Sequence, residues 1–403
     1  MVSEAECGVA IDWATEFNHY TDEYAANAFA VWDELRGTCP VAHSDAFRGM
    51  WVPTRHEDIV AIAQDTDTFS SRSPLVAQYG SMADFGIVVP PISSDPPYHT
   101  EIRRMLLPFF SPGRIEALRP GVEAHCDELI DGFLDGPGCD AAADYAQYIP
   151  VQVIATMLGI PHEDGDQFRT WVHELLENAP TNIEVAGMNL FALFQYFGEH
   201  MERMKIEPRD DLISFLVAQA HDVIGRELNQ DELFGMCLLL LLAGIDTTWS
   251  AIGASIWHLA SHTDDQKRLR AEPELWPVAL EELLRAYAPV TMAREVVKDT
   301  EFRGCPMHAG DPLLLPFPSA NRDPAVFDRP DEVIIDRAEN RHLAFGVGIH
   351  RCLGSNLARL EVQVAVSRFV DRVGPFHLGD ADSVRWSKGQ VRGPRVLPIV
   401  FDR

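Results

Sequence analysis

The sequence has no closely spaced pair of cysteines. Its seven cysteines are scattered over the chain, at positions 7, 39, 126, 139, 237, 305 and 352. Zinc ribbons and dithiol redox centres need a C-x-x-C pair or a similar cluster, so neither kind of site has support. An odd number of scattered cysteines is typical of a reducing compartment, and we therefore expect a cytoplasmic protein.

Positive charge and long apolar runs are also scarce. Lysine and arginine number 33 against 61 aspartates and glutamates, which gives a net charge of −28. This excess of negative charge argues against nucleic acid or an anionic membrane as a partner. The longest apolar run, residues 236–245, is too short to span a bilayer. Residues 1–6 are acidic and lack the apolar core of a signal peptide.

What the sequence does contain is a glycine-rich segment with a cysteine near its end, residues 345–354. Apolar residues recur after it at helical spacing, so Cys352 lies just before or at a helix N-terminus. The positive end of a helix favours a thiolate, and the glycines let the backbone turn tightly against a flat ligand. A thiolate in such a loop suits haem iron as an axial ligand. The alternative is a buried structural cysteine. A dinucleotide loop is excluded because Arg351 takes the place of a required glycine.

The pattern Phe-x-x-Gly-x-His-x-Cys-x-Gly in residues 345–354 resembles the haem-binding loop of the cytochrome P450 family. The resemblance extends from about Thr54 to the C-terminus, with four motifs in family order. It implies a mainly α fold with a minor β-sheet (α+β), forming one triangular domain over residues 1–403 with a loose arm at 1–20. It also implies haem b as cofactor, with Cys352 as the iron ligand and with contacts from Phe345, Gly346 and Gly354.

A buried helix is predicted after the cap Asn229, because the segment 233–243 is apolar on every face. It runs into Gly244, Ile245, Asp246, Thr247 and Thr248, which are poor choices for a helix interior and therefore indicate a site. A threonine hydroxyl that bonds the i−4 carbonyl would bend the helix and make room for dioxygen.

These residues resemble the oxygen-activation motif of the family. The resemblance implies that Thr247 hydrogen-bonds dioxygen or its water, that Asp246 relays protons, and that Ala243 lies beside the cofactor. The alternative is a capped kink in which Asp246 pairs with an arginine.

Basic residues in three segments are candidates for binding the haem propionates. His99 and Arg103 share one helical face, and the resemblance assigns both to the propionates. It assigns Arg294, at the start of a strand, and His342 in the same way, with His350 as the weaker candidate. The alternative for His99, Arg103 and Arg294 is ordinary surface charge.

Glu282 and Arg285 are three residues apart on a predicted amphipathic helix and can pair. The resemblance implies that this pair is buried and supports the cysteine loop together with a third basic residue. The sequence leaves open whether that residue is Arg322, Arg329 or Arg337.

A long loop at 70–96 and two helices at 163–177 and 184–205 correspond to the roof and lid of the substrate pocket in the family. We expect a hydrophobic small-molecule substrate, because the proposed lining is apolar. The lining residues are Ile87, Leu239, Leu242, Ala243, Val290, Met292 and Val391. Arg72 or Arg392 would be available to anchor a carboxylate.

Arg351 and Arg359, with Arg103 and Arg104, predict a basic patch on the cysteine side of the haem. Such a patch would receive an acidic ferredoxin- or flavodoxin-like electron donor. The alternative is that these arginines are partners of propionates and helix ends. No flavin or iron–sulfur module follows the cysteine loop, so we expect the donor to be a separate protein.

The expected reaction is a monooxygenation, in which one oxygen atom from O2 enters the substrate by hydroxylation or oxidative demethylation. A peroxide-driven peroxygenase is the first alternative, which the intact Asp246–Thr247 pair disfavours. A non-catalytic haem-binding or sensing protein is the second.

Overall fold

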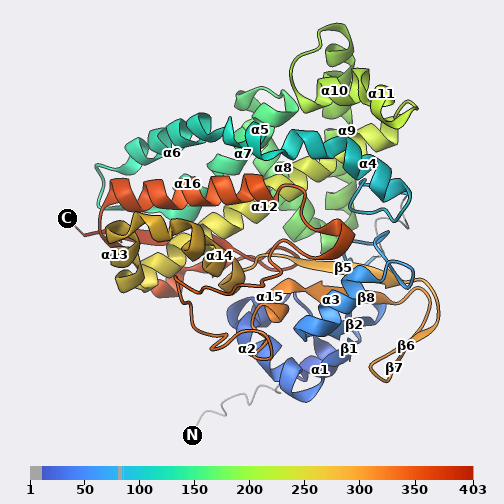
Figure 1. Cartoon of the computed structure of the whole chain (residues 1–403), viewed down its shortest axis with the longest axis horizontal. Coiled ribbons are helices and arrows are strands. Elements are labelled where there is room, and N and C mark those ends of the chain that lie inside the picture. The colour runs from blue at the N-terminus through green and yellow to red at the C-terminus, as the bar shows by residue number, and fades with distance from the viewer. Residues whose placement is uncertain (1–10, 80–83, 85, 403) are drawn as a thin grey trace, which may run out of the picture.

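The computed structural model describes residues 11–79, 84 and 86–402. Helices make up most of these residues and small sheets a minor part, so the mainly α fold with a minor β-sheet is confirmed. Figure 1 shows a roughly triangular outline, with most helices above and a β-rich region below at the N-terminal end. The helices are α1 (Trp13–Glu16), α2 (Asp22–Thr38), α3 (His56–Gln64), α4 (Tyr98–Leu106), α5 (Pro112–Glu116), α6 (Arg119–Phe133), α7 (Tyr148–Leu158), α8 (Gly165–His173), α9 (Ile183–Ile206), α10 (Leu212–Ala218), α11 (Ala220–Ile224), α12 (Gln230–Ser261), α13 (Thr263–Ala271), α14 (Trp276–Ala286), α15 (Phe317–Ala320) and α16 (Ser355–Val373).

The strands form one five-stranded sheet and three smaller sheets. The large sheet has the order β1-β2-β8-β5-β3, in which only β2 and β8 run parallel. The strands are β1 (Val41–Ser44), β2 (Met50–Pro53), β3 (Phe69–Ser70), β4 (Gly138–Asp140), β5 (Thr291–Val296), β6 (Thr300–Phe302), β7 (Cys305–Met307), β8 (Pro312–Pro316), β9 (Phe376–Leu378), β10 (Arg385–Trp386), β11 (Pro394–Val396) and β12 (Pro398–Phe401).

Strand β5 places two predicted site residues on one face. Met292 and Arg294 are two residues apart in a strand, so both side chains point to the same side of the sheet. Ala293, between them, packs into the opposite cluster with Val52 and Leu314. The alternation of side chains thus carries both a pocket residue and a cationic residue toward the helical half of the molecule.

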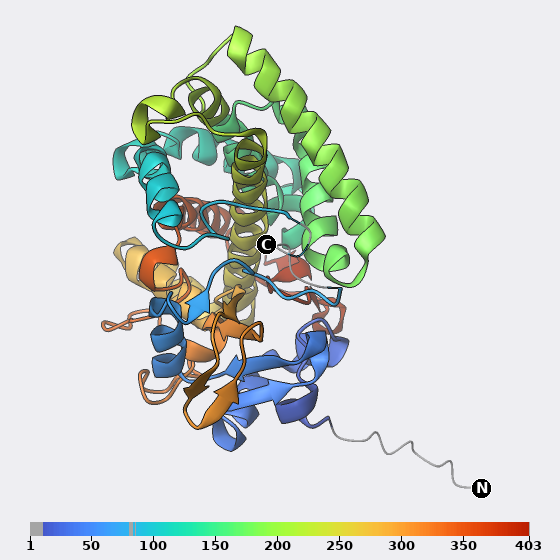
Figure 2. The same cartoon turned by 90° about the vertical axis from the view of Figure 1, so that its right-hand side faces the viewer.

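Helix α12 is the centre of the fold. Figure 2 shows it running through the middle of the molecule, with α9 along one outer side. Asn229 and Glu232 form the predicted capping box, and the apolar residues that follow join the main core. By length and composition α12 would be able to cross a membrane, but 61% of its most apolar window is buried inside the protein, as in the core helix of a globular fold.

Some local predictions were wrong. Residues 12–20 do not form a loose arm, because Phe17 and His19 are buried against α2; residues 1–10 of that predicted arm lie outside the described part. The predicted helix 163–177 changes at Glu174 into a π-helical turn, η6 (Glu174–Asn178). Thr247 does bond the carbonyl of Ala243 as predicted, but every residue of α12 keeps helical backbone angles, so the helix does not open there.

Candidate active site

The cysteine loop is held by backbone contacts that only glycine permits at two positions. Gly346 and Gly348 have φ of +67° and +76°, in the left-handed region that favours glycine. A Cβ on Gly348 would lie 2.9 Å from the Ala63 carbonyl oxygen of α3. The Cys352 N–H donates to the Phe345 carbonyl over 2.8 Å, which closes the loop. Helix α16 begins three residues later, as the spacing predicted.

The thiol of Cys352 is exposed at the surface of its loop. The surrounding protein raises its pKa by desolvation, against the Gly354 N–H and the guanidinium groups of Arg103, Arg351 and Arg359. Desolvation thus opposes the stabilisation of a thiolate that the place of Cys352 before a helix suggested. A bound metal ion would overcome this, because a coordinating thiol is deprotonated outright.

Four basic side chains converge beside the cysteine loop. The rings of His99 and His350 lie 4.3 Å apart between centroids, and Arg103 and Arg294 act on both electrostatically. Arg294 is 4% exposed, and burial lowers its pKa to about 10, with Asp95 as an opposing acid. Among the described residues, both nitrogens of His99 and Nε2 of His350 have no hydrogen-bond partner. A buried cluster of this kind needs an anion.

His342 is not free to join this cluster. Its Nε2 lies 2.9 Å from Glu281 Oε2, and its Nδ1 accepts the Ala344 N–H. Glu281 is also bound by Arg359, whose guanidinium lies over the Phe345 ring. The side chain of His342 is thus already satisfied, whereas Nε2 of His350 has no partner among the described residues.

The two histidines are expected to respond differently to substitution by alanine. If the unpaired Nε2 of His350 donates to a haem propionate, as the resemblance implies, His350→Ala should speed haem loss, because it removes one hydrogen bond to a charged group, a contribution of about 1.5–3 kcal/mol. His342→Ala should lower the midpoint of chemical unfolding, because Glu281 loses one of its partners. Haem transfer to apomyoglobin and denaturant titration measure the two effects. Faster haem loss in His342→Ala alone would contradict this assignment.

The predicted Glu282–Arg285 pair is fully buried, with both side chains 0% exposed. Arg285 donates to both carboxylate oxygens of Glu282, over 2.7 and 2.9 Å. Arg337 is the third basic residue and donates to Glu282 Oε2 over 2.9 Å. Asn340, in the segment that leads to the cysteine loop, donates to the same oxygen. The network therefore holds the segment before the cysteine loop against α14.

On α12, Thr247 and Ala243 line a cavity. The Thr247 hydroxyl donates to the Ala243 carbonyl over 2.7 Å, so its lone pairs are left to accept from a group in the cavity. Asp246 is 2% exposed and lies one helical turn from the cavity residue Leu242. Asp246 Oδ1 lies 2.7 Å from Arg395 Nη2 on β11, which is the arginine pairing that the sequence left open.

Arg395 is a residue that the sequence did not single out, because nothing in the sequence around it marks it. It binds two acids, since its Nε donates to Glu177 Oε1 over 2.6 Å while Nη2 faces Asp246. Glu177 in turn lies 3.4 Å from His173, which is 44% exposed. Burial raises the pKa of Asp246, against the charge of Arg395. The ionisable side chains thus form a line from solvent to the edge of the cavity, in the order His173, Glu177, Arg395 and Asp246.

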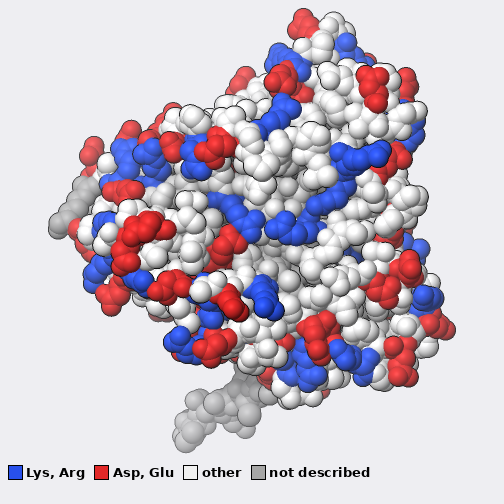
Figure 3. Space-filling model, in the orientation of Figure 1, with Lys and Arg blue, Asp and Glu red and all other residues white. Residues whose placement is uncertain are grey.

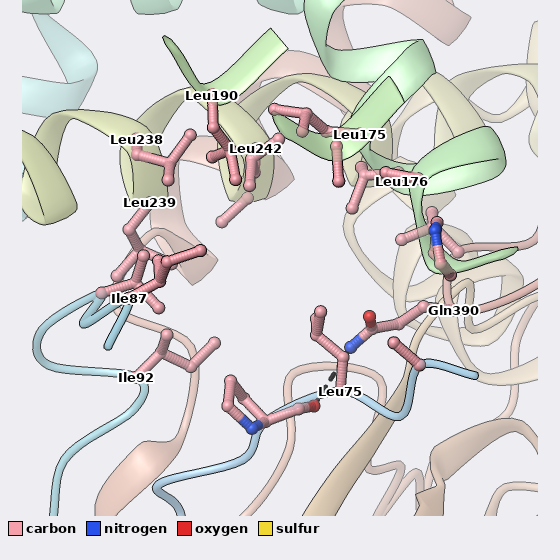
Figure 4. A pocket seen from close by; sticks show the side chains of 18 of the residues that line it. Leu75, Ile87, Ile92, Leu175, Leu176, Leu190, Leu238, Leu239, Leu242 and Gln390 are labelled. Atoms are coloured by element: carbon pink, nitrogen blue, oxygen red, sulfur yellow. Dashed lines mark hydrogen bonds between the residues drawn. The ribbon is translucent and has the colours of Figure 1, made fainter. Parts of the chain in front are cut away.

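Figure 4 shows the cavity, which has a volume of about 1330 Å³ including its part open to solvent. All seven residues predicted to line the pocket are among its lining residues. Sequence reasoning missed further lining residues on the loop before α4, on the lid and on α12, because their apolar positions look like ordinary core. They include Leu75, Ile92, Leu175, Leu176, Leu190 and Leu238.

The roof of the cavity is joined to the lid by hydrogen bonds. The Gln78 N–H donates to the Pro180 carbonyl over 3.0 Å, and the Tyr79 hydroxyl donates to the Ala179 carbonyl. Arg72 is ion-paired with Glu295, and Arg392 is stacked on Trp386. Neither arginine is among the residues that line this cavity.

One face of the molecule carries a basic area. Figure 3 shows Lys and Arg side chains gathered near the centre of this face, over α4 and the cysteine loop. Arg104 and Arg351 are exposed there. Arg103 instead donates to the Arg351 carbonyl over 2.5 Å, and Arg359 is paired with Glu281. Within the described part of the chain, two arginines of the predicted patch have no side-chain hydrogen bond or ion pair, and the other two have local partners.

The residues present fit a haem group. An exposed thiol, three unsatisfied histidine nitrogens and two arginines gather at the cysteine loop, and the same chain holds an apolar cavity lined by Thr247 of α12. A porphyrin offers two carboxylates to the basic cluster and an iron atom to the thiol. The thiol and the basic side chains therefore match the groups that haem offers. The wall of the cavity at Thr247 is left for other ligands.

Comparison with known proteins identifies the family of this chain. The family model for cytochrome P450 matches residues 192–373. Mycinamicin IV hydroxylase/epoxidase of Micromonospora griseorubida is 34% identical over 396 residues, which is 95% of this chain and 98% of that protein. Vitamin D(3) 25-hydroxylase of Pseudonocardia autotrophica is 40% identical over 315 residues, 77% of either chain.

Among solved structures, the Bacillus subtilis 168 cytochrome P450 PksS of the bacillaene polyketide synthase has a TM-score of 0.87 at 32% identity. The match covers 96% of this chain and 100% of that one. The similarity in sequence and in fold thus extends over nearly the whole length of the chain. The chain therefore belongs to the cytochrome P450 family and is a haem-thiolate monooxygenase, with haem b as its cofactor.

Proposed function

We propose that Cys352 is the axial ligand of the haem iron and that His99, Arg103, Arg294 and His350 bind the propionates. The observation that supports this most is the set of buried histidine nitrogens without partners beside the cysteine loop. When bound, haem b supplies the activation of dioxygen and the transfer of one oxygen atom to the substrate. The site draws on residues from α4 to β11, so we propose that the whole chain acts as one unit.

We further propose that Thr247 and Asp246 deliver protons to the reaction. The Thr247 hydroxyl lines the cavity and, while it donates to Ala243, would accept a hydrogen bond from a water and keep that water in place. Asp246 lies at the edge of the same helical face, where burial favours its protonated form. The apolar lining and the joined roof and lid keep bulk water away from these groups.

Thr247→Ala tests this role. We expect the fraction of consumed NADH that yields product to fall by roughly 10²-fold, the low end of what a positioned proton-transfer group contributes, while haem content stays the same. Product and peroxide per NADH are measured in parallel. Thr248→Ala is the matched control, because Thr248 is buried outside the cavity lining.

Unchanged coupling in Thr247→Ala would contradict the role. Equal turnover with hydrogen peroxide alone and with a reductase system would favour a peroxygenase instead.

The substrate that we propose is a bulky hydrophobic molecule. The cavity is lined almost wholly by aliphatic side chains, with Thr247, Tyr79 and Gln390 as its few polar contributions. Tyr79 and Gln390 hydrogen-bond backbone carbonyls of Ala179 and Pro74. Relatives of this chain act on mycinamicin IV and on vitamin D(3). A screen of such compounds for a spin-state shift of the haem would identify binders, and binding of charged compounds alone would exclude this class.

We propose an acidic ferredoxin or flavodoxin as the electron donor, docked over Arg104 and Arg351. The central basic area on an acidic protein favours such a partner by electrostatic steering. All described cysteines are free thiols, which agrees with a meeting of the two proteins in the cytoplasm.

Arg104→Glu should weaken this encounter. We expect the rate of reduction by a bacterial ferredoxin to fall by about tenfold at low salt and by less at high salt, because steering is screened. Stopped-flow reduction at two ionic strengths measures it. Lys267→Glu on α13, whose side chain is 70% exposed, is the control for the change of net charge. Equal effects of the two variants would contradict a docking site at Arg104.

A further inference from the structure

Two carboxylates share one guanidinium at the edge of the cavity. Arg395 reaches Glu177 through Nε and Asp246 through Nη2, over 2.6 and 2.7 Å. Its Nη1 donates to Ser250, and its guanidinium lies 4.1 Å from the centroid of the Trp249 ring. These contacts hold Arg395 in one place, so a change in charge at one acid alters the field at the other.

The second acid belongs to the wall of the substrate cavity. Glu177 lies in the π-helical turn η6, and its neighbours Leu175 and Leu176 line the cavity. π-helical turns within helices are rare and are frequently found at functional sites. In this turn Leu176 belongs both to the core and to the cavity wall, while Glu177 accepts from Arg395 on β11. The lid segment that encloses substrate thus also carries the residue that faces Arg395.

We propose that Glu177 and Arg395 are positioning residues that set when Asp246 holds a proton. This rests on the proposed function, in which Asp246 supplies a proton to the cavity. Arg395 does not carry the proton, because a guanidinium stays protonated. When the Asp246 O–H bond breaks, the proton passes to the water held by Thr247. The carboxylate that remains is stabilised by Arg395 until a solvent water returns a proton to it.

The direction in which the neighbouring groups shift the pKa of Asp246 follows from the charges that face it. These are Arg395 on β11, Glu177 on η6 and His173 at the end of α8. The negative charge of Glu177 raises the pKa of Asp246, and the positive charges of Arg395 and His173 lower it. Without the charge of Glu177, Arg395 would attract the Asp246 carboxylate alone, and the protonated form would be lost at a lower pH.

Glu177→Gln tests this, because the amide oxygen still accepts from Arg395 while the charge is gone. The infrared C=O band of a protonated carboxyl, assigned to Asp246 by its absence in Asp246→Asn, is titrated in the holoenzyme. We expect the titration in Glu177→Gln to move to lower pH by about one unit. His173→Gln should move it to higher pH by a smaller amount. Glu174→Gln is the matched control, since Glu174 lies in the same turn and accepts from Asn178 instead.

An unmoved band in Glu177→Gln, or an equal movement in Glu174→Gln, would overturn the proposal. A role of Glu177 in stability alone would change the yield of folded holoenzyme and leave the titration where it is. The proposed function is tested separately, by product formed per NADH in Asp246→Asn. If Asp246→Asn forms as much product per NADH as the unaltered protein, Asp246 has no proton role. If Asp246→Asn forms less product and the infrared band in Glu177→Gln does not move, only the role of Glu177 is wrong.

Discussion

Replacing Cys352 with serine is expected to abolish turnover and to remove the thiolate signature from the optical spectrum of the reduced, CO-bound protein. Serine keeps the size of the side chain and the backbone contact to Phe345, so the loop retains its shape. Its hydroxyl is a poor ligand and gives the iron far less electron density than a thiolate, which is the property that favours O–O cleavage. Product formation should drop to background, and bound haem should decrease.

Cys305→Ser provides the control. Cys305 is a half-buried thiol on β7, and its Sγ donates to the Val41 carbonyl in the sheet region. We expect its CO spectrum and turnover to match those of the unaltered protein. A thiolate spectrum that persists in Cys352→Ser would show that another cysteine binds the iron, and the proposed site would then be wrong.

Glu282→Gln is expected to have the largest effect on stability. The substitution preserves shape but leaves Arg285, which is 0% exposed, and Arg337, which is 8% exposed, without their carboxylate. Breaking a buried ion pair by removing one partner costs about 3–5 kcal/mol. Because Asn340 and the Ile334 N–H also bind Glu282, the segment before the cysteine loop should loosen. Denaturant titration and the rate of haem loss measure the two consequences.

Glu332→Gln is the matched control for this substitution. Glu332 pairs with Arg329, and both side chains are more than half exposed, so the pair should contribute less than about 1 kcal/mol. Equal unfolding midpoints for Glu282→Gln and Glu332→Gln would show that the buried network does not support the fold.

Local sequence patterns determine part of the structure of this protein. Short-range patterns predicted the position of Cys352 before α16 and the capped central helix α12, and the family resemblance predicted the apolar lining at Leu239, Leu242 and Met292. These features depend on helical or strand periodicity and on residues close to one another in the chain. The family resemblance then connected them, since motifs of one family imply one arrangement.

The tertiary structure decided which of several similar residues has a free side chain. His342 and His350 are alike in sequence, but Glu281 on α14 occupies one of them and leaves the other beside His99. Arg337 was one of three candidates until the fold brought it to Glu282.

No local sequence pattern predicted the role of Arg395, because its two acidic partners, Glu177 on η6 and Asp246 on α12, are far away in the chain. The reason is physical: the state of a charged or polar side chain depends on which partners compete for it in space. Periodicity sets the direction of a side chain, and only long-range packing sets its partners.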